Sequence, residues 1–146
     1  MIRFMKSLNN ISRSQAIYRN SKISVDDLQS GHYALVLSIC HEPGRSQEML
    51  AKELCLNKST IARQLSYLED KGYISRSSLP NNKRQFSVYP TEKMMNVLPI
   101  VKEASNNWML LLSQDIPKDE LEIFESVLKR MEKRAREIVI NQEDNQ

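Results

Sequence analysis

Two apolar patterns in the middle of the chain, separated by a polar turn, limit the folds that this sequence can adopt. The first pattern consists of Met49, Leu50 and Leu54, and the second of Ile61, Leu65 and Leu68. Spacings of three and four residues place side chains on one face of an α-helix. Ser46 and Asn57 precede the two patterns, and both residue types are favoured N-caps. We therefore predict a helix, a short turn and a second helix between Ser46 and about Lys71.

The outward face of the second predicted helix carries short polar and cationic side chains. With its apolar residues turned inward, the 100° advance per residue places Ser59, Arg63 and Ser66 opposite them, flanked by Thr60 and Gln64. Short hydroxyls allow a partner to come close, an arginine can grip guanine or phosphate, and a glutamine can bond adenine. The free N–H groups of the helix start also attract phosphate. This pattern favours a DNA-reading helix over a plain solvated face.

A β-hairpin is predicted directly behind this helix. The stretches "KGYISRSS" and "RQFSVY" are strand candidates with Ile74, Phe86 and Val88 on one side, and "LPNN" between them supplies turn residues. Lys83 and Arg84 lie near the tip. A hairpin behind a helix-turn-helix forms a wing, whose cations can reach a DNA backbone or enter a minor groove. Protection of an edge strand from aggregation is the alternative role for these cations.

Positive charge is concentrated in this same segment. The chain has a net charge of only +3. Residues 57–84 contain six basic and two acidic residues, a balance of +4, so the rest of the chain sums to −1. The basic residues are Lys58, Arg63, Lys71, Arg76, Lys83 and Arg84. A positive segment in a near-neutral chain is typical of a surface that binds a polyanion, although a solvated basic face has the same composition.

Further helical patterns flank the central segment. A loosely amphipathic helix is predicted from Met1 to about Asn20, and a second from Leu28 to Cys40. The second buries a stripe of Tyr33, Val36, Leu37 and Cys40. Behind the hairpin, Thr91 caps a long helix that contains Pro99 and an apolar pattern. That pattern is Met94, Met95, Leu98, Val101, Trp108 and Leu112.

The last predicted helix is the most regular. Its apolar residues are Leu121, Phe124, Leu128, Met131, Ala135 and Ile138, and Ile123 and Val127 form a second strip beside them. Asp119 and Glu120 near its start, and Arg134 and Arg136 near its end, suit the helix dipole. A monomer would leave much of this apolar surface in water. We therefore predict a homodimer joined by its terminal helices, with Met5 and Leu8 of the first helix contributing.

Composition narrows the remaining function classes. A length of 146 residues suits one domain, and three glycines with 40% hydrophobic residues suit a mainly α protein. Cys40 and Cys55 lie in apolar patterns, which favours inert core thiols and a reducing cytoplasm. No apolar run approaches the about 18 residues of a membrane helix. With His32 and His41 as the only histidines, no catalytic, metal-binding or cofactor-binding motif is present, so we predict no enzyme.

The joined series of motifs resembles the MarR family of winged-helix transcription regulators over essentially the whole chain. The series is two helices, then "SQEMLAKELCLNKSTIARQLSYLEDKGYI", then "SRSSLPNNKRQFSVYPTEK", then two long helices. The resemblance implies a dimer in which each recognition helix, here Asn57 to about Lys71, enters a major groove and each wing enters the adjoining minor groove. It also implies that a small molecule or an oxidant tunes DNA affinity, often from a pocket between the dimerisation and DNA-binding regions.

Residue by residue, the resemblance assigns DNA-binding roles. Lys58, Ser59, Thr60, Arg63 and Gln64 match the groove-facing positions, Arg84 the wing arginine and Arg76 the basic residue at the start of the wing. Two positions depart from the family pattern. Asn82 replaces an acidic residue that would position the wing arginine, and Cys55 stands in a turn where glycine is frequent.

These observations predict one mainly α domain over residues 1–146. Residues 28–94 form the winged helix-turn-helix region with a two-stranded wing, and residues 1–27 and 95–146 form dimerisation helices. The predicted function is a cytoplasmic homodimer that represses transcription from a pseudo-palindromic site, with release by a small-molecule effector. A winged-helix module that binds protein or RNA, and a thiol-based redox sensor, are the alternatives.

Overall fold

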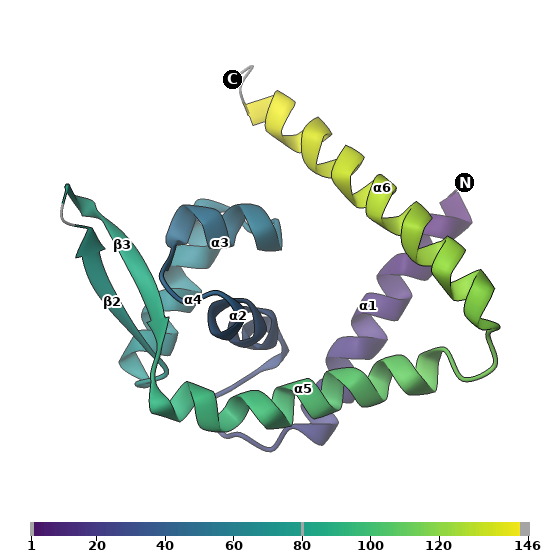
Figure 1. The fold of residues 1–146 in the computed structure, drawn as a ribbon, viewed down its shortest axis with the longest axis horizontal. Helices are drawn as coiled ribbons and strands as arrows, with labels where there is room; N and C mark the ends of the chain where they lie inside the picture. Colours follow the sequence, from purple (N-terminus) through teal and green to yellow (C-terminus); the bar gives the residue numbers. More distant parts are fainter. Residues whose placement is uncertain (1, 80, 144–146) are drawn as a thin grey trace. The chain divides into compact units, whose positions relative to one another are not determined.

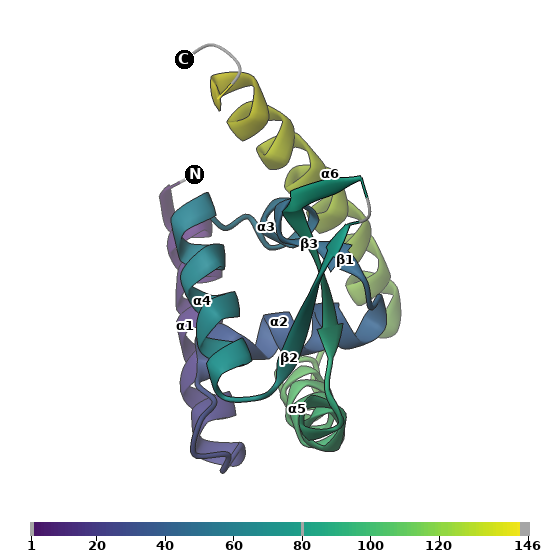
Figure 2. The ribbon, with the colours of Figure 1, turned by 90° about the vertical axis from the view of Figure 1, so that its left-hand side faces the viewer.

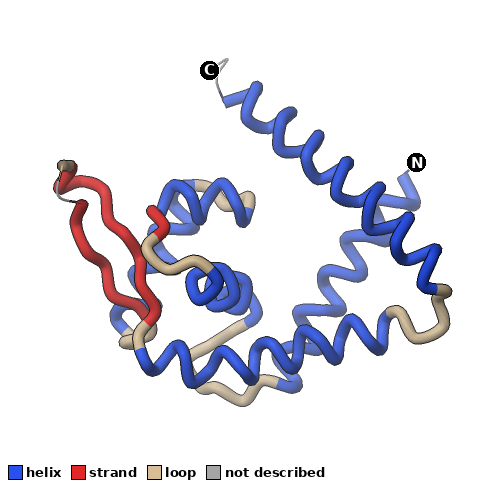
Figure 3. Tube along the Cα trace, viewed as in Figure 1, coloured by secondary structure: helices blue, strands red, loops and turns tan. Residues whose placement is uncertain are grey.

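Six helices and three strands follow one another along the residues that the structure describes (Figures 1 and 3). The computed structural model describes residues 2–79 and 81–143, and the side chains of residues 2, 79, 83, 84 and 141–143 are outside the described part. The elements are α1 (Ile2–Lys22), α2 (Ser30–His41), β1 (Arg45–Ser46), α3 (Gln47–Leu54), α4 (Lys58–Asp70), β2 (Ile74–Leu79), β3 (Asn82–Pro90), α5 (Glu92–Leu112) and α6 (Lys118–Glu143). The chain divides into two compact units, Met1–Trp108 and Met109–Gln146.

The core of the first unit contains the inward face of α4. Ile61, Leu65 and Leu68 are fully buried, as their spacing predicts. They belong to a cluster with Leu50 of α3, Val88 of β3 and residues of α2 and α5. Burying each such side chain contributes roughly 1.5–3 kcal/mol. This burial fixes the rotation of α4 about its own axis, so its opposite face is turned to solvent.

Two side-chain caps begin the helices of the helix-turn-helix, as predicted. Ser46 Oγ accepts a hydrogen bond from the Met49 backbone N–H at 3.2 Å. Asn57 Oδ1 accepts from the Thr60 backbone N–H at 2.8 Å and from the Ser59 hydroxyl at 2.9 Å. Each cap satisfies an N–H group that has no partner within the helix, which is worth about 1 kcal/mol. The caps therefore define where α3 and α4 start.

Cys55 itself adopts the turn conformation that glycine usually provides. Its φ of 53° and ψ of 40° are left-handed, and its backbone N–H bonds to carbonyls at the end of α3. The departure from the family pattern at this position therefore leaves the turn intact. Contrary to the prediction of a core thiol, Cys55 is exposed. The reason is that a C-cap residue leaves the face of its helix.

The wing has three strands at its base instead of the predicted two. β2 and β3 form the hairpin, and β1 pairs antiparallel with β3, so the strand order is β1-β3-β2. Arg45 and Ser46 of β1 lie opposite Val88 and Ser87 of β3. A strand of two polar residues has no alternation that a sequence pattern can reveal. The two-stranded description therefore holds only for the part of the hairpin beyond β1.

The predicted burial pattern of the hairpin holds near its base only. Ile74 and Val88 are buried, but Phe86 is 41% exposed. Figure 1 shows the hairpin leaning away from α3 and α4 toward its tip, in agreement with the exposure of Phe86. At the other end of β3, the strand ends at Pro90. Thr91 Oγ1 accepts a hydrogen bond from the Met94 backbone N–H in the first turn of α5, so Thr91 caps this helix as predicted.

Several helices bury other residues than those predicted from the apolar spacing. In α2, Tyr33 and Val36 are buried as expected, but Leu37 and Cys40 are only half-buried. Leu35 is buried instead, because α2 has neighbours on several sides, in α1, α3 and β3. Met49 of α3 and Met95 of α5 are exposed and lie outside the core. The α5 residues that belong to the core are Met94, Val97, Val101 and Ala104.

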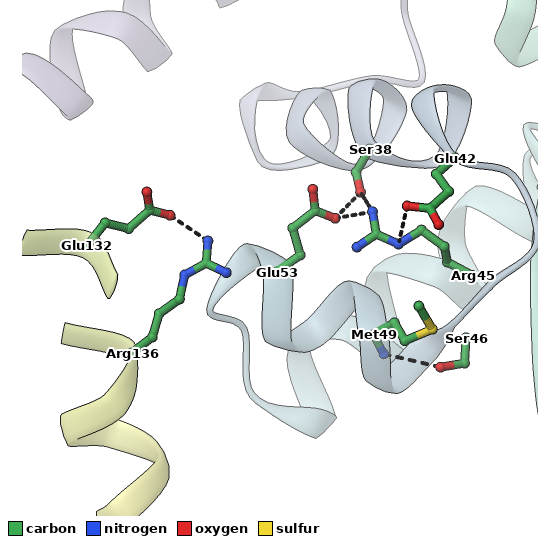
Figure 4. Close-up of polar contacts among 8 residues, drawn as sticks. All are labelled: Ser38, Glu42, Arg45, Ser46, Met49, Glu53, Glu132 and Arg136. Atoms are coloured by element: carbon green, nitrogen blue, oxygen red, sulfur yellow. Dashed lines mark hydrogen bonds and ion pairs between the residues drawn. The ribbon is translucent and has the colours of Figure 1, made fainter. Parts of the chain in front are cut away.

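The second unit contains α6. Asp119 and Glu120 lie in its first turn, as predicted. Arg134 and Arg136 are not in its last turn, because the helix continues to Glu143. They pair with nearby carboxylates of the same helix, Arg136 with Glu132 (Figure 4).

Candidate nucleic-acid interface

The outward face of α4 presents its polar residues to solvent. Lys58, Ser59, Arg63 and Ser66 are exposed, and Thr60 is half-buried. The Asn57 cap orients the Ser59 hydroxyl at the start of the helix. Unpaired N–H groups at a helix start carry partial positive charge and attract anions. This face therefore offers hydroxyl, guanidinium and ammonium groups to a polyanion along about two and a half helical turns.

Gln64 is turned toward α2. Its side-chain Oε1 is buried and has no hydrogen-bond partner among the described residues. A cavity of about 300 Å³ lies beside it, lined by Gln29, Gly31, His32, Arg63, Gln64 and Tyr67. A Cβ on Gly31 would lie 3.4 Å from Gln64 Nε2, so the glycine leaves room for this amide. Contact with a base therefore requires Gln64 to turn away from α2.

The start of α2 is held against α4 by His32, for which no role is predicted from the sequence. The Gln29 backbone N–H donates to His32 Nδ1 at 3.2 Å, forming part of a capping box. The imidazole stacks on Tyr67 of α4 with 4.9 Å between ring centroids. Burial lowers the pKa of His32, which favours the neutral ring whose Nδ1 can accept this bond. A histidine three residues after a helix N-cap is the only local signal for this role.

Lys71 forms an ion pair with Asp27 at the surface of the protein, where its side chain is 42% exposed. Its ammonium lies 3.1 Å from the Asp27 carboxylate, and Lys93 lies 3.6 Å from the other oxygen of that carboxylate. The hydrogen bond from Lys71 lowers the pKa of Asp27, and the same bond raises the pKa of Lys71. The Tyr67 hydroxyl also donates to the Asp27 backbone carbonyl at 2.9 Å. Lys71 therefore contributes less to the positive surface than its place in the charged segment suggests.

Arg76 is also paired, with two residues of α4. Its guanidinium contacts the Glu69 carboxylate and the Ser66 hydroxyl, and its side chain is 20% exposed. Figure 2 shows the chain leaving the end of α4 and turning into β2, which brings the two elements together. The side chains of the remaining two wing cations, Lys83 and Arg84, lie outside the described residues. Their backbone belongs to β3, which begins at Asn82.

A polar cluster joins α2, β1 and α3 (Figure 4). Arg45, whose side chain is 12% exposed, pairs with Glu53, donates to Ser38 Oγ at 3.1 Å and lies 3.7 Å from Glu42. The Ser38 hydroxyl in turn donates to Glu53 at 2.5 Å. Sequence patterns gave no sign of this cluster, because its members are up to 15 residues apart. It ties the first helix of the helix-turn-helix to the base of the wing.

The predicted dimerisation residues are largely open to solvent within their own units. In α1, Met5 is exposed and Leu8 is half-buried. In α6, Phe124 is 47% and Met131 is 42% exposed, and Ile138 is also exposed. Leu121 and Leu128 are half-buried. A shallow apolar depression runs along α6, lined by Val127, Arg130, Met131, Arg134, Ala135 and Ile138.

Other kinds of site find no support in the part of the chain that the structure describes. No group of three or more potential ligands could hold a metal ion there. None of the helices found among residues 2–79 and 81–143 is long and apolar enough to cross a membrane. Cys40 is half-buried, and burial raises the pKa of its thiol, which disfavours the reactive thiolate.

Comparison with known proteins agrees with this geometry. Residues 28–86 match the model of the MarR family. The HTH-type transcriptional regulator YybA of Bacillus subtilis (strain 168) is 26% identical over 129 residues, which cover 88% of this chain and 86% of that protein. The crystal structure of MarR superposes with a TM-score of 0.80 at 29% identity, covering 92% of this chain and 91% of that chain.

A third similar structure shows the same fold at lower identity. It is a MarR family regulator from Listeria monocytogenes, solved in complex with 26mer DNA. The TM-score is 0.86 and the identity 22%, covering 91% of this chain and 89% of that chain. The shared fold and family are those of transcriptional regulators, which are not enzymes. The matched segment spans α2, the helix-turn-helix and most of the hairpin, so this chain contains a winged helix-turn-helix domain of the MarR family, a family of DNA-binding transcriptional regulators.

Proposed function

We propose that this protein is a cytoplasmic homodimer that represses transcription by occupying a pseudo-palindromic operator in duplex DNA. The observation that carries the proposal is the outward face of α4, where Ser59 and Arg63 are exposed beside the Asn57 cap. A protein of the same fold binds a 26mer DNA. Two recognition helices related by a two-fold axis suit half-sites about 10 base pairs apart.

The proposed contacts divide into base-reading and backbone-binding groups. Lys58, Ser59, Thr60, Arg63 and Gln64 enter the major groove, and Lys83 and Arg84 reach the backbone or minor groove from the wing. Arginine can bond guanine through two donors, whereas a wing-tip lysine acts on phosphate as a point charge. Removing a residue of either group should therefore lower DNA affinity, but the size of the decrease should depend on DNA sequence more strongly for the base-reading group.

Replacing Arg63 by alanine tests the base-reading role. We expect a loss of about 1–3 kcal/mol on the preferred site and a relaxed preference at one base pair. Lys83→Ala is the matched control, because loss of a phosphate contact should weaken all sequences alike. The measurement is fluorescence anisotropy on a duplex selected from a random library and on its scrambled counterpart. Equal losses on both duplexes for Arg63→Ala would contradict the proposal.

We assign DNA binding and dimerisation to separate segments of the chain, with the boundaries predicted from the sequence. Residues 28–94 bind DNA, and residues 1–27 and 95–146 provide the dimer contacts within one functional domain. The exposed apolar residues of α1 and α6 support this assignment. Apolar side chains in contiguous exposed patches commonly mark protein interfaces.

Release by a small-molecule effector is a further part of the proposal. Arg19 of α1 is half-buried, and its Nε has no hydrogen-bond partner among the described residues. Burial lowers the pKa of this guanidinium. Tyr18, the residue before Arg19, forms an aromatic pair with Trp108 of α5, with 5.3 Å between the ring centroids. A planar carboxylate with an aromatic ring would satisfy both features.

A thermal-shift screen of aromatic carboxylates tests this effector class. We expect at least one compound to raise the melting temperature and to weaken operator binding, because it binds one state of the dimer better than the other. Arg19→Gln should remove the response while retaining the fold. Responses of equal size in the parent and in the variant would exclude Arg19 as the anchor.

The alternative functions are separated by the same binding assay. A protein- or RNA-binding module would bind the selected duplex no better than scrambled DNA or RNA of the same sequence. A thiol-based sensor would lose its oxidant response when Cys40 or Cys55 is replaced by serine. The exposed hydroxyls and arginine of α4 favour duplex DNA, whose major groove accepts a helix of this width.

A further inference from the structure

We propose that Arg76 is a positioning residue that holds the wing at a set angle to the recognition helix through Glu69, rather than a direct contact to DNA phosphate. The inference rests on the proposed DNA-binding function and assigns a different role to one of its predicted contact residues. It also assigns a role to Glu69, an acid on a surface where acids oppose DNA binding.

Three polar contacts carry the inference. Arg76 Nε donates to Glu69 Oε2 at 2.8 Å, and Nη2 lies 2.6 Å from the same oxygen. Nη2 also donates to Ser66 Oγ at 3.2 Å. Two nitrogens of one planar guanidinium therefore grip a single carboxylate, which restricts orientation more than a lysine could. Ser66 belongs to the outward face of α4, so the guanidinium is fixed beside that face.

The position of Arg76 in the sheet makes it a suitable brace. Arg76 pairs with Val88 in the register of β2 and β3, and Val88 is buried in the core. The only covalent link from α4 to β2 is the short turn at Gly72, whose φ is +76°. Toward its tip, the hairpin extends away from α4 (Figure 1). A small rotation at the base would therefore displace the tip by a larger distance.

Charge balance argues against a direct phosphate contact. The Glu69 carboxylate neutralises the guanidinium at short distance, so the pair has no net charge to attract DNA. A phosphate that displaced Glu69 would leave that carboxylate facing the DNA backbone, and like charges at such distances repel. The pair favours DNA binding only if it orients groups that do contact DNA, such as the wing-tip cations.

A charge exchange separates positioning from direct contact. The variants are Arg76→Ala, Arg76→Glu, Glu69→Arg and the double variant Glu69→Arg/Arg76→Glu. The probe is a labelled duplex of about 25 base pairs, selected from a random library and long enough for two half-sites one turn apart. We expect Arg76→Ala and Arg76→Glu to weaken binding about tenfold or more, and the exchanged pair to recover most of the loss. Circular dichroism and size-exclusion chromatography check that each variant is folded and dimeric.

A double-mutant cycle with the wing tip provides a second readout. If Arg76 acts through the wing, Arg76→Ala should have little effect in an Arg84→Ala background, because the contacts it positions are already lost. Arg76→Lys should recover only part of the affinity, since an ammonium cannot grip Glu69 and Ser66 in the same fork. The inference would be overturned in favour of a phosphate contact by two results together. The affinity losses of Arg76→Ala and Arg84→Ala would multiply in the double variant, and Glu69→Arg/Arg76→Glu would bind DNA as weakly as Arg76→Glu.

Amide hydrogen exchange tests the brace without DNA. Arg76→Ala should raise exchange in β2 and β3, and the exchanged pair should restore protection. If the parent protein shows no preference for the selected duplex, the proposed function fails. The hydrogen-exchange pattern still tests whether Arg76 holds the wing against α4. Unchanged exchange in Arg76→Ala would overturn the brace whatever the protein binds.

Discussion

Replacing Phe124 and Met131 by glutamate should convert the protein to a monomer that binds its operator about 10²–10⁴-fold more weakly than the dimer. Both side chains belong to the apolar strip of α6 and are roughly half exposed within their own unit. Burying an unpaired carboxylate in an apolar interface is strongly unfavourable. Loss of the second subunit also removes the gain in effective concentration that two linked half-sites provide.

Analytical ultracentrifugation and anisotropy titrations measure the two parts of this result. The matched control is Ser126→Glu/Lys133→Glu, because 100° per residue places these positions on the opposite side of α6 from the apolar strip. The control should remain a dimer and keep its operator affinity. A dimeric Phe124→Glu/Met131→Glu variant with parent-like affinity would show that α6 does not join the subunits through this strip.

Operator affinity should fall about 10⁴-fold between 50 and 200 mM salt. Residues 57–84 contain six basic residues, of which Lys71 pairs with Asp27 and Arg76 pairs with Glu69. The other four are Lys58, Arg63, Lys83 and Arg84. About eight such cations in a dimer would release enough counterions for a slope of about −7 in a plot of log affinity against log salt.

Single substitutions test which cations contribute to that slope. Lys58→Ala should make the slope less steep by about two per dimer, because each subunit loses one contact. Lys71→Ala is the matched control: its charge is held by Asp27, and Lys93 remains beside that carboxylate. The slope of the control should stay close to that of the parent. A slope near zero, or equal flattening by the two substitutions, would refute this distribution of contacts.

Local patterns predicted much of the fold. Ser46 and Asn57 cap α3 and α4, and Ile61, Leu65 and Leu68 form the buried face of α4. These features depend on neighbours within one or two helical turns, so residue type and spacing are sufficient to predict them. The outward position of Ser59 and Arg63 follows from the same periodicity.

The sequence by itself therefore determined which face of α4 is turned to solvent and which residue types it offers. Only the tertiary structure decided which of the cations are already paired: Lys71 with Asp27, 44 positions earlier in the chain, and Arg76 with Glu69 across the turn into β2. It also decided that Gln64 lies against α2 and that β1 joins the wing. The physical reason is that a helical or strand period specifies the direction of a side chain relative to its own element. Which element lies in that direction depends on how the whole core packs.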